Sequence, residues 1–312
     1  MKVAIIACCK MEELYIIEWL DWHLDICGFN HIFLCDNNDY NYKYELKHIV
    51  KKYIDEGKVT VYDYNDVHPI QPYCYDEVYR KHGNEYDWFS TIDIDEFYCL
   101  PKYNNNIHEY LSIIHDDMYH IYIPWQIYGD NELIEYDNKY IQERFKNPVH
   151  LVADKYGEVI VNGYYYRYKP LFRGKQYFND ETIYIKDQHR GIYDIKDINK
   201  NIRYDSNFNK IGDRYGHLLT GINYNIKNAI ISYNKSGENI PQNVIDIFNS
   251  CHLKHYITKT IDEWVKYKIY RGDTLLKNDD NRYPYTIDKF FHYNNITNEK
   301  INFIKEKYNI IN

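Results

Sequence analysis

The sequence lacks long apolar runs, paired cysteine motifs and an excess of basic residues, and each absence excludes a class of protein. No stretch approaches the roughly 20 apolar residues that cross a bilayer, so no transmembrane helix is predicted. The formal net charge of -8 argues against a general nucleic-acid binder, which needs a cationic face. Seven cysteines without a C-x-x-C pair suit reduced, buried thiols, and they predict a cytoplasmic protein.

Length and composition favour one large domain with an appendage. The 312 residues can bury a sizeable core, and they contain neither internal repeats nor a long low-complexity linker. We predict a main domain over residues 1–272 and a C-terminal helical appendage, packed on it, over residues 273–312. Tyrosine is unusually frequent, at 38 residues, and most of these side chains are predicted to be structural.

The chain begins with a strand, a helix and a second strand. The apolar run over residues 1–9 is interrupted by Lys10 before a signal peptide could be completed, so it predicts a buried strand. Residues 12–27 carry apolar side chains at helical spacing, Gly28 is placed to end that helix, and residues 31–35 predict the next strand. This succession implies a parallel sheet with a right-handed crossover, a Rossmann-like beginning.

The remaining periodicity predicts an α/β fold, with a mostly parallel mixed sheet flanked by helices, a β-rich extension over residues 140–204 and C-terminal helices. The predicted helices cover residues 46–53, 73–82, 107–114, 261–269 and 301–308. The predicted strands cover residues 59–62, 88–97, 120–125, 159–161, 164–168 and 182–185. Residues 205–250 carry little signal. Trp19 and His23, one helical turn apart, are expected to pack against the sheet.

Two carboxylates close the apolar strand predicted over residues 88–97. Side chains alternate along a strand, so Asp93 and Asp95 should share one face. Like charges about 4 Å apart repel by roughly 4 kcal/mol at an effective dielectric near 20, and a divalent cation would remove that cost. Such cations often complete their coordination with substrate phosphates, and ligands bind outside the carboxyl ends of the strands in α/β sheets. The pair therefore predicts a metal-diphosphate site. The alternative is a solvated strand end or a cap for the next element.

Three blocks of sequence, read together, resemble one enzyme family. The blocks are Lys10-Met11-Glu12 with Glu18-Trp19-Leu20, His23, Gly28-Phe29 and Asp36-Asn37; Asp93-Ile94-Asp95-Glu96-Phe97; and His255-Tyr256-Ile257-Thr258-Lys259 with Arg271-Gly272. In this order they resemble the glycosyltransferases of family 92 and their relatives in the family 2-like group, over roughly residues 3–272. Met11 departs from the asparagine that the family usually has in this triplet. The resemblance implies a GT-A fold, with the catalytic domain over residues 1–272.

The resemblance also implies an activity and a ligand set. The implied activity is metal-dependent transfer of a hexose, with inversion, from a nucleotide diphosphate sugar such as a UDP-sugar to a hydroxyl of a glycan or glycoconjugate. The implied ion is Mn²⁺ or Mg²⁺, with a histidine ligand favouring Mn²⁺. The implied metal ligands are Asp93, Asp95 and His255, and the implied nucleotide-binding residues are Glu12, Asp36, Asp93, Lys259 and Arg271.

Further residues are candidates for contacts with the sugar or the acceptor, namely Trp125, Tyr128, Lys169, Arg173 and His189. An inverting enzyme also needs a carboxylate base, for which Asp130 and Asp187 are both candidates. Structural alternatives stay open for these positions. Burial in the core would explain the aromatic residues and His255, turn capping would explain Asp36, helix-dipole stabilisation would explain Glu12, and a solvated strand face would explain Lys169 and Arg173.

Two other functions compete with this prediction. A sugar nucleotidyltransferase would use the same acids on a nucleoside triphosphate, although the sequence lacks a glycine-rich phosphate loop followed by lysine. A non-catalytic sugar-binding or scaffold protein would keep the fold and bind glycans without metal. The C-terminal residues 299–308 mix lysines with apolar side chains, so they predict either a peripheral membrane contact or a helix packed on the catalytic domain.

Overall fold

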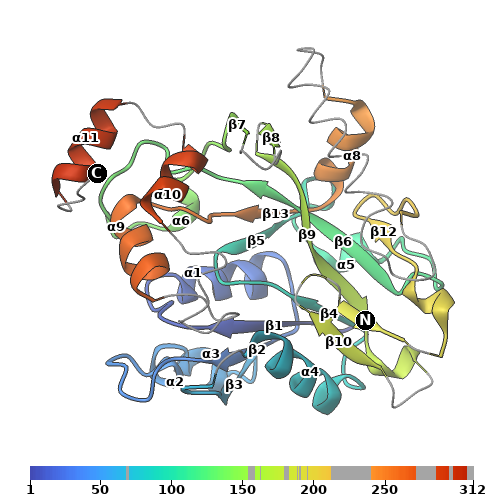
Figure 1. The fold of residues 1–312 in the computed structure, drawn as a ribbon. Helices are drawn as coiled ribbons and strands as arrows, with labels where there is room; N and C mark the ends of the chain where they lie inside the picture. The colour runs from blue at the N-terminus through green and yellow to red at the C-terminus, as the bar shows by residue number, and fades with distance from the viewer. Residues whose placement is uncertain are drawn as a thin grey trace.

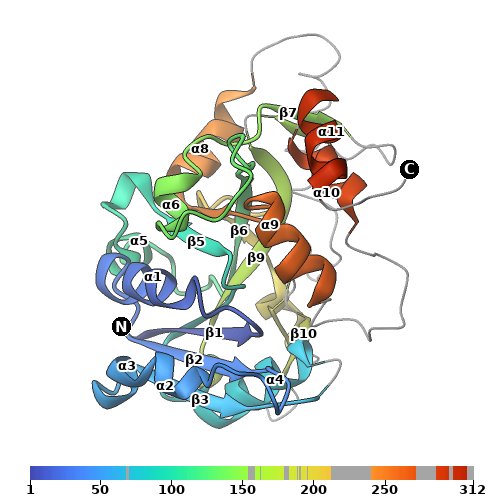
Figure 2. The same cartoon turned by 90° about the vertical axis from the view of Figure 1, so that its left-hand side faces the viewer.

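The computed structural model describes residues 1–67, 70–153, 159–161, 163–178, 183–187, 189, 191–194, 196–211, 240–271, 286–294 and 298–307. Eleven of the described strands form one sheet, eight of them along the path β3-β2-β1-β4-β9-β6-β13-β5, while β7, β8 and β12 pair off this path. Helices lie on both of its faces, as Figures 1 and 2 show. Strands β10 and β11 form a separate two-stranded sheet. The predicted α/β class, with its mostly parallel sheet, is confirmed.

The strands are β1 Val3–Cys9, β2 His31–Asp36, β3 Val59–Asp63, β4 Trp88–Thr91, β5 Glu96–Cys99, β6 His120–Ile127, β7 Leu151–Ala153, β8 Val159–Val161, β9 Tyr164–Arg173, β10 Tyr184–Asp187, β11 Gly191–Tyr193, β12 Tyr204–Asp205 and β13 His252–His255. The α-helices are α1 Ile16–Asp21, α2 Leu46–Ile49, α3 Lys51–Asp55, α4 Gln71–His82, α5 Ile107–Leu111, α6 Ile141–Arg144, α8 Gln242–Ser250, α9 Ile261–Trp264, α10 Ile287–Asn294 and α11 Asn298–Lys307. The π-helical turns are η1 Trp22–Ile26 and η5 Val265–Tyr270, and the 3-10 turns are η2 Pro101–Tyr103, η3 Lys175–Tyr177 and η4 Ile198–Asn201.

The parallel half of the sheet contains β1 to β4. Strand β1 pairs in parallel with β2 and with β4, and β2 pairs in parallel with β3. Strand β9 then runs antiparallel between β4 and β6, while β13 is parallel to β6 and antiparallel to β5. The chain builds outward from β1 through β2 to β3 and then returns to place β4 on the other side of β1. At such a reversal of strand order, α/β sheets commonly bind ligands outside the carboxyl ends of the strands.

Both faces of β1 are buried, which explains its continuous apolar sequence. Val3, Ile5 and Ala7 belong to the core cluster that also contains residues of α1 and α5. Ala4 and Ile6 belong to a second cluster with residues of α4. Figures 1 and 2 show α1 on one side of β1 and α4 on the other. The end of β1 is therefore held firmly between two packed layers.

Most predicted elements are present, with local differences. The helix predicted over residues 12–27 begins as α1 and continues into η1, and Gly28 ends it with a φ of +78°. The helix predicted over residues 46–53 is divided into α2 and α3 at Val50, whose backbone has left the helical region (φ -97°, ψ 14°). The β-rich extension over residues 140–204 is confirmed, with the short helix α6 inside it.

The acidic motif is not one strand, so this part of the prediction is wrong. Strand β4 ends at Thr91, and β5 begins at Glu96 after a turn. The backbone N–H of Glu96 donates to the carbonyl of Asp93 (3.1 Å), and the Glu96 side chain accepts the N–H of Asp93 (2.9 Å). Strand β5 then pairs with β13 instead of prolonging β4. Because Asp93 and Asp95 lie in this turn, strand alternation does not place them on a common face.

Trp19 and His23 are buried against the sheet, as predicted. The Trp19 indole donates to the carbonyl of Glu96 (2.8 Å). His23 Nδ1 lies 2.8 Å from the Trp19 carbonyl, and its Nε2 accepts the backbone N–H of Tyr98 (3.2 Å). Nε2 accepts a hydrogen bond and Nδ1 faces a carbonyl oxygen, so the imidazole is neutral with its proton on Nδ1. Burial lowers the pKa of His23 from its ordinary value to about 3.

His23 should make folding sensitive to acid. The unfolded histidine takes up a proton near pH 6.5 and the folded one does not, so stability is full above pH 6.5 and is lost as the pH falls towards 3. Between pH 7.5 and 5 the loss should be about 2 kcal/mol. Urea unfolding of wild type and His23→Gln at both pH values measures it, since the stability difference between them should shrink by about that amount at pH 5. A stability difference between wild type and His23→Gln that does not change with pH contradicts the assignment. The control is His48→Gln, which alters an exposed histidine.

The cysteines, the helices and the C-terminal segment were also predicted from the sequence. All seven cysteines are free thiols, and six of them are buried, as the sequence predicted. Every helix in the described ranges is too short or too polar to cross a membrane. Helices α10 and α11 pack on α9 through a cluster of Ile261, Trp264, Phe290 and Ile304. Residues 273–285 lie outside the described part of the chain, so the domain boundary near 272 stays a prediction.

Candidate functional site

Most of the predicted site residues gather at the carboxyl ends of β1, β2, β4 and β13. Cys9 ends β1, Asp36 ends β2 and His255 ends β13, while Asp93 follows β4 by two residues. These strands run in the same direction, so their ends meet at one edge of the sheet. Acidic, basic and aromatic side chains far apart in the sequence come into contact there.

Asp93 is held by a lysine and a glutamine. Lys169 Nζ donates to Asp93 Oδ2 (2.7 Å), and Gln71 Nε2 donates to Asp93 Oδ1 (2.9 Å). Lys169 is fully buried in β9 and also lies 3.7 Å from Glu96. Burial acts to raise the pKa of Asp93, but Lys169 outweighs it and holds that pKa below its ordinary value. Both oxygens of Asp93 are therefore already engaged by side chains of the protein.

Glu96, next to this pair, is fully buried and carries an unusual carboxyl group. Its Oε2 accepts the Asp93 N–H, and its Oε1 has no hydrogen-bond partner among the described residues. Burial raises the pKa of Glu96 well above its ordinary value, although Lys169 acts in the opposite direction. Of the three acids in the motif, Glu96 therefore favours the neutral form most strongly.

Asp95 faces His255 and Lys268. Lys268 Nζ donates to Asp95 Oδ2 (2.7 Å), and His255 Nε2 lies 3.5 Å from Asp95 Oδ1. Burial acts to raise the pKa of Asp95, but Lys268 and His255 hold it well below its ordinary value. Burial lowers the pKa of His255, although Asp95 opposes this shift. At neutral pH the pair is a carboxylate facing an imidazole that retains a lone pair.

Lys259 contributes a second buried ammonium to this site. Its side chain is buried, and its Nζ lies 4.1 Å from the ring centroid of Tyr15. Within the described part of the chain, this ammonium donates no hydrogen bond. Burial lowers the pKa of Lys259, and the negative charges of Glu12 and Asp95 oppose that shift in part. Its backbone is left-handed (φ 55°), a conformation that costs a residue with a side chain about 1–2 kcal/mol and recurs at functional sites.

Glu12 and Arg271 form an ion pair at the end of β1. Arg271 Nη1 donates to a Glu12 carboxylate oxygen and to the carbonyl of Lys10. The second oxygen of Glu12 is buried without a hydrogen-bond partner among the described residues. Asp36 accepts two hydrogen bonds from Asn38 (3.0 and 2.8 Å), so it does cap its own turn, and burial raises its pKa. A nucleotide-binding role for Glu12 and Asp36 stays a prediction.

Met11 adopts a left-handed backbone conformation at the junction of two loops. Its φ is +53°, in the left-handed region that asparagine tolerates best after glycine. Its N–H donates to Asn38 Oδ1 (2.7 Å), which joins the loops after β1 and β2. Met11 therefore carries backbone strain at a position where asparagine would carry less.

Replacing Met11 with asparagine should stabilise the protein by about 0.5–1 kcal/mol, because asparagine lowers the cost of the left-handed conformation. The midpoint of urea unfolding measures the gain. Met11→Leu is the control, since it retains both the strain and the apolar side chain, and it should give no gain. Equal effects of the two substitutions would contradict this explanation.

The predicted sugar-site residues divide into two groups. Trp125 lies 4.4 Å from His255 and 5.5 Å from His189 between ring centroids, and Lys169 Nζ lies 5.9 Å from its ring. Its indole N–H has no hydrogen-bond partner among the described residues. Tyr128 is nearby but packs on Tyr256 (4.9 Å), a core contact. Trp125, Lys169 and His189 thus belong to one cluster with His255.

Arg173 lies elsewhere. Strand β9 extends to Arg173, which pairs with Trp88 at the start of β4, roughly 13 Å along the strand from Lys169. Its guanidinium packs over the ring of Trp88 (4.4 Å) and donates to the carbonyl of Met118 (3.1 Å). The structure therefore places Arg173 at the opposite edge of the sheet, where it anchors strands, so its predicted proximity to the site is wrong.

The two candidate bases are placed differently. Asp130 is buried, its carboxylate accepts the N–H of Glu132 (3.0 Å), and its own N–H donates to Asn294 of α10 (2.8 Å). These contacts give Asp130 a role in capping its own turn. Asp187 ends β10, but its side chain lies outside the described part of the structure. The choice of a base stays a prediction.

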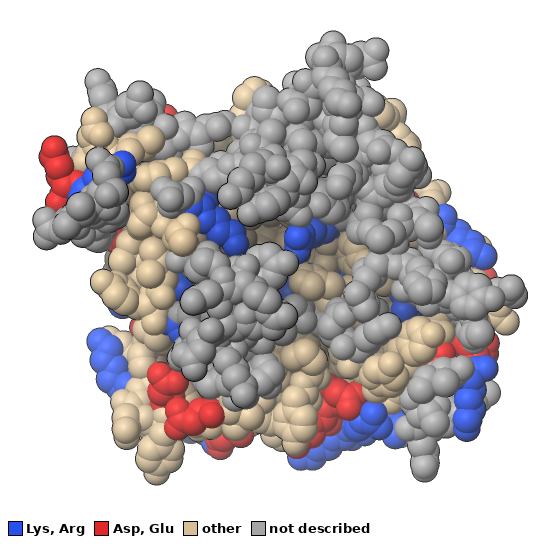
Figure 3. Space-filling model, in the orientation of Figure 1, with Lys and Arg blue, Asp and Glu red and all other residues tan. Residues whose placement is uncertain are grey.

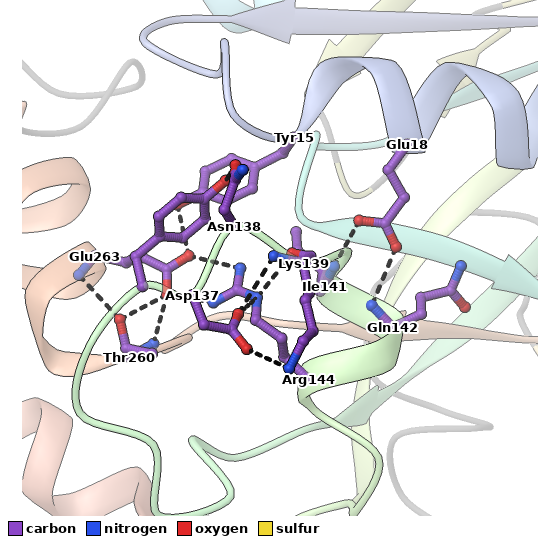
Figure 4. A network of polar contacts seen from close by, with 11 residues as sticks. Tyr15, Glu18, Asp137, Asn138, Lys139, Ile141, Gln142, Arg144, Thr260 and Glu263 are labelled. Atoms are coloured by element: carbon purple, nitrogen blue, oxygen red, sulfur yellow. Dashed lines mark hydrogen bonds and ion pairs between the residues drawn. The ribbon is translucent and has the colours of Figure 1, made fainter.

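A buried network fixes the segment that carries Lys259 and Lys268 (Figure 4). Thr260 and Glu263 form a reciprocal capping box at the start of α9. Arg144 of α6 donates to both carboxylate oxygens of Glu263 (2.7 and 2.9 Å), and the Tyr15 hydroxyl donates to one of them (2.8 Å). Because Lys259 directly precedes this box and η5 directly follows α9, the network positions the cations of the site.

Acidic and basic side chains are distributed differently on the face of the molecule drawn in Figure 3. In Figure 3, Asp and Glu atoms lie mainly along the edges of this face, whereas Lys and Arg atoms are also visible in its hollowed middle. The acids of the site are largely buried, Asp95 and Glu96 to more than nine-tenths. Buried carboxylates with lysine and arginine side chains in contact suit an anionic ligand that arrives with a metal ion.

The predicted metal ligands fit an ion only in part. Asp95 Oδ1 and His255 Nε2 are 3.5 Å apart, close enough to bind one cation, and His255 Nδ1 is buried without a partner among the described residues. Asp93 does not join them, because Gln71 and Lys169 engage its oxygens. Groups of three His, Cys, Asp or Glu side chains arranged around an ion are absent from the described residues. A two-residue site completed by phosphates is a common arrangement for Mg²⁺ and related ions.

No family model and no curated protein matches this chain. Crystal structures of S. aureus TarS resemble part of it. A TarS 1–349 structure matches 55% of this chain and 47% of that chain, with 14% identity and a TM-score of 0.34. The complex of TarS 1–349 with UDP-GlcNAc matches 44% and 37%, with 14% identity and a TM-score of 0.31. The chain therefore spans less than half the length of the TarS chains it matches.

Three residues of the site were missed in the sequence. Lys268 and Gln71 bind Asp95 and Asp93, and Glu96 was noted only as part of the motif. The helical spacing over residues 261–269 placed Lys268 on a helix but gave no signal for its partner. The sequence signal for these partners was the pair Asp93 and Asp95 itself, because buried acids need nearby cations whether or not a metal is present.

Proposed function

We propose that this protein is a GT-A type glycosyltransferase that moves a sugar from a nucleotide diphosphate donor, with UDP as our first choice, to a hydroxyl of a glycan or glycoconjugate. One observation carries the proposal. Asp95 and His255, distant in sequence, lie 3.5 Å apart at the carboxyl edge of the sheet, with the Lys268 ammonium 2.7 Å from Asp95 and the buried Lys259 near enough to interact with it electrostatically. This set matches the charge and oxygen content of a metal-bound diphosphate.

The chemical demand on such a site is to stabilise a departing diphosphate. Lys259 is suited to this because its buried ammonium has no hydrogen bond within the described residues, and a charge-assisted bond to a phosphate oxygen contributes about 1.5–3 kcal/mol. Asp95 and His255 would hold Mn²⁺ or Mg²⁺, which acts as a Lewis acid on the diphosphate when bound. Metal dependence remains part of the proposal.

The rest of the donor can be assigned to neighbouring positions. Glu12 and Asp36, at the ends of β1 and β2, lie where α/β sheets receive a base and ribose, and Glu12 retains a buried oxygen without a partner among the described residues. Arg271 holds Glu12 in place and adds positive charge. Trp125 offers an aromatic face and an indole N–H to the sugar, with His189 and Lys169 next to it.

The acceptor side is assigned less fully. An inverting transfer needs a base that takes the proton of the acceptor hydroxyl, and Asp187 and Asp130 remain the candidates, although Asp130 is occupied in its own turn. We place the protein in the cytoplasm, where free thiols such as its seven cysteines persist. No nucleic-acid partner is proposed, given the net charge of -8.

A thermal-shift screen tests this proposal. UDP, GDP, CDP and dTDP are each added with and without Mn²⁺, and a ligand at 100 times its dissociation constant adds about 2.7 kcal/mol to stability. We expect a rise in Tm with one nucleotide, and only when the metal is present. A Tm unchanged by all four would contradict the proposal. Release of pyrophosphate from a nucleoside triphosphate and a sugar phosphate would instead identify a nucleotidyltransferase.

A further inference from the structure

Lys268 lies where it neutralises the proposed metal ligand Asp95. Its Nζ is 2.7 Å from Asp95 Oδ2, and the exposed fractions of the two side chains are 11% and 5%. The other oxygen of Asp95 lies 3.5 Å from His255 Nε2. Among the described residues, the Lys268 ammonium is therefore the cation that contacts Asp95 most closely.

A metal ion and the Lys268 ammonium repel each other when both are bound to the Asp95 carboxylate. An ion between Asp95 and His255 would lie within a few ångströms of the Lys268 ammonium, and the two positive charges repel strongly in a site shielded from water. A diphosphate relieves the conflict, because its oxygens accept hydrogen bonds from the lysine.

We propose that Lys268 is an exchangeable counter-ion, which neutralises Asp95 in the empty site and moves to the diphosphate when metal and nucleotide bind together. This inference rests on the proposed function and deepens it. Its consequence is positive coupling: the metal alone and the nucleotide alone bind weakly, and each strengthens the binding of the other by the same factor. The device keeps the buried carboxylate paired in both states, which avoids an isolated buried charge.

Calorimetric titrations of the full chain test the exchange. The titrants are Mn²⁺ alone, and UDP in the presence of saturating Mn²⁺; GDP, CDP or dTDP replaces UDP if the thermal-shift screen selects it. In Lys268→Met we expect Mn²⁺ alone to bind about tenfold more tightly, because the competing cation is gone. We expect the nucleotide with Mn²⁺ to bind about tenfold more weakly, because a charge-assisted hydrogen bond is lost.

Two further variants complete the design. Lys268→Arg keeps the charge and should retain the wild-type pattern, which also tests the exchange if Lys268→Met folds poorly. Lys266→Met removes an exposed lysine from the same π-helical turn, where its ammonium contacts the Tyr267 hydroxyl (2.6 Å), and it should leave both affinities unchanged.

The inference requires the two affinities of Lys268→Met to move in opposite directions. If both weaken, both stay unchanged or only one moves, Lys268 is a structural residue or a simple phosphate ligand, and the exchange is overturned while the proposed function stands. If wild type binds none of the four nucleoside diphosphates with Mn²⁺, the proposed function and the exchange fail together. The wild-type titration therefore separates the two failures.

Discussion

Replacing Asp95 with asparagine should abolish metal-dependent nucleotide binding and reduce sugar transfer by at least about 100-fold. Asp95 is the acid that faces His255, and Lys268 and His255 hold its pKa well below the ordinary value against the effect of burial. It is therefore anionic at any pH of interest. An ion bound there would contribute several kcal/mol of charge stabilisation, and each 1.36 kcal/mol is tenfold in rate.

Two comparisons make the Asp95→Asn result specific. Asp63→Asn alters an exposed carboxylate at the end of neighbouring β3, paired with Lys47 at 2.5 Å, and it should leave nucleotide binding unchanged. Circular dichroism must show that Asp95→Asn keeps the fold. A folded Asp95→Asn protein that binds nucleotide and Mn²⁺ as well as wild type would rule out the assigned role of Asp95.

Replacing Arg144 with leucine should destabilise the protein by about 3–5 kcal/mol, the largest effect on stability that we expect. Arg144 and Glu263 are 1% and 2% exposed and share two hydrogen bonds (Figure 4). Burial acts to raise the pKa of Glu263, but Arg144 and Thr260 hold it below its ordinary value, so the carboxylate stays charged. Without Arg144, that charge is buried and poorly compensated. The midpoint of urea unfolding measures the loss.

The matched control for Arg144→Leu is Arg80→Leu, which breaks an exposed ion pair with Asp76 within α4 (2.6 Å). Exposed helical pairs contribute about 0.3–0.5 kcal/mol, so this variant should be nearly as stable as wild type. Adding Glu263→Leu to Arg144→Leu should restore part of the loss, because the uncompensated charge is then gone. Equal losses for Arg144→Leu and Arg80→Leu would show that the buried network does not stabilise the fold.

The network also links stability to the site. Thr260 and Glu263 begin α9, and the chain continues directly into η5 with Lys268. A weakened capping box would therefore disturb the cations before the whole domain unfolds. Nucleotide binding by Arg144→Leu, measured at a temperature where the variant is still folded, should be weaker than that of wild type.

The sequence located the site because parallel strands end at one edge. The strand-helix-strand pattern places Asp36 and Glu12 at or just after the ends of the first two strands, and the structure has both there. His255 and Trp125 were added by resemblance, and their rings lie 4.4 Å apart. Regular periodicity was sufficient to place the first pair, whereas the second pair needed the family resemblance.

Other features depend on contacts that no local pattern encodes. The turn at Asp93 forms because Glu96 bonds back to Asp93 and β5 finds its partner in β13, far along the chain. Lys268 reaches Asp95 across 173 residues of sequence. Arg173 appeared close to Lys169 in the sequence, but an extended strand separates them. Tertiary pairing decided each of these outcomes.

The measurement that tests the central claim most directly is consumption of donor. Purified protein with Mn²⁺ is incubated with a panel of UDP-, GDP-, CDP- and dTDP-sugars, and released nucleoside diphosphate is quantified, with Asp95→Asn as the background. We predict that one donor class is hydrolysed slowly without an acceptor, that release requires Mn²⁺, and that Asp95→Asn reduces it to background. Binding of a glycan without consumption of any donor, indifferent to Mn²⁺ and to Asp95→Asn, would contradict the account and identify a non-catalytic sugar-binding protein.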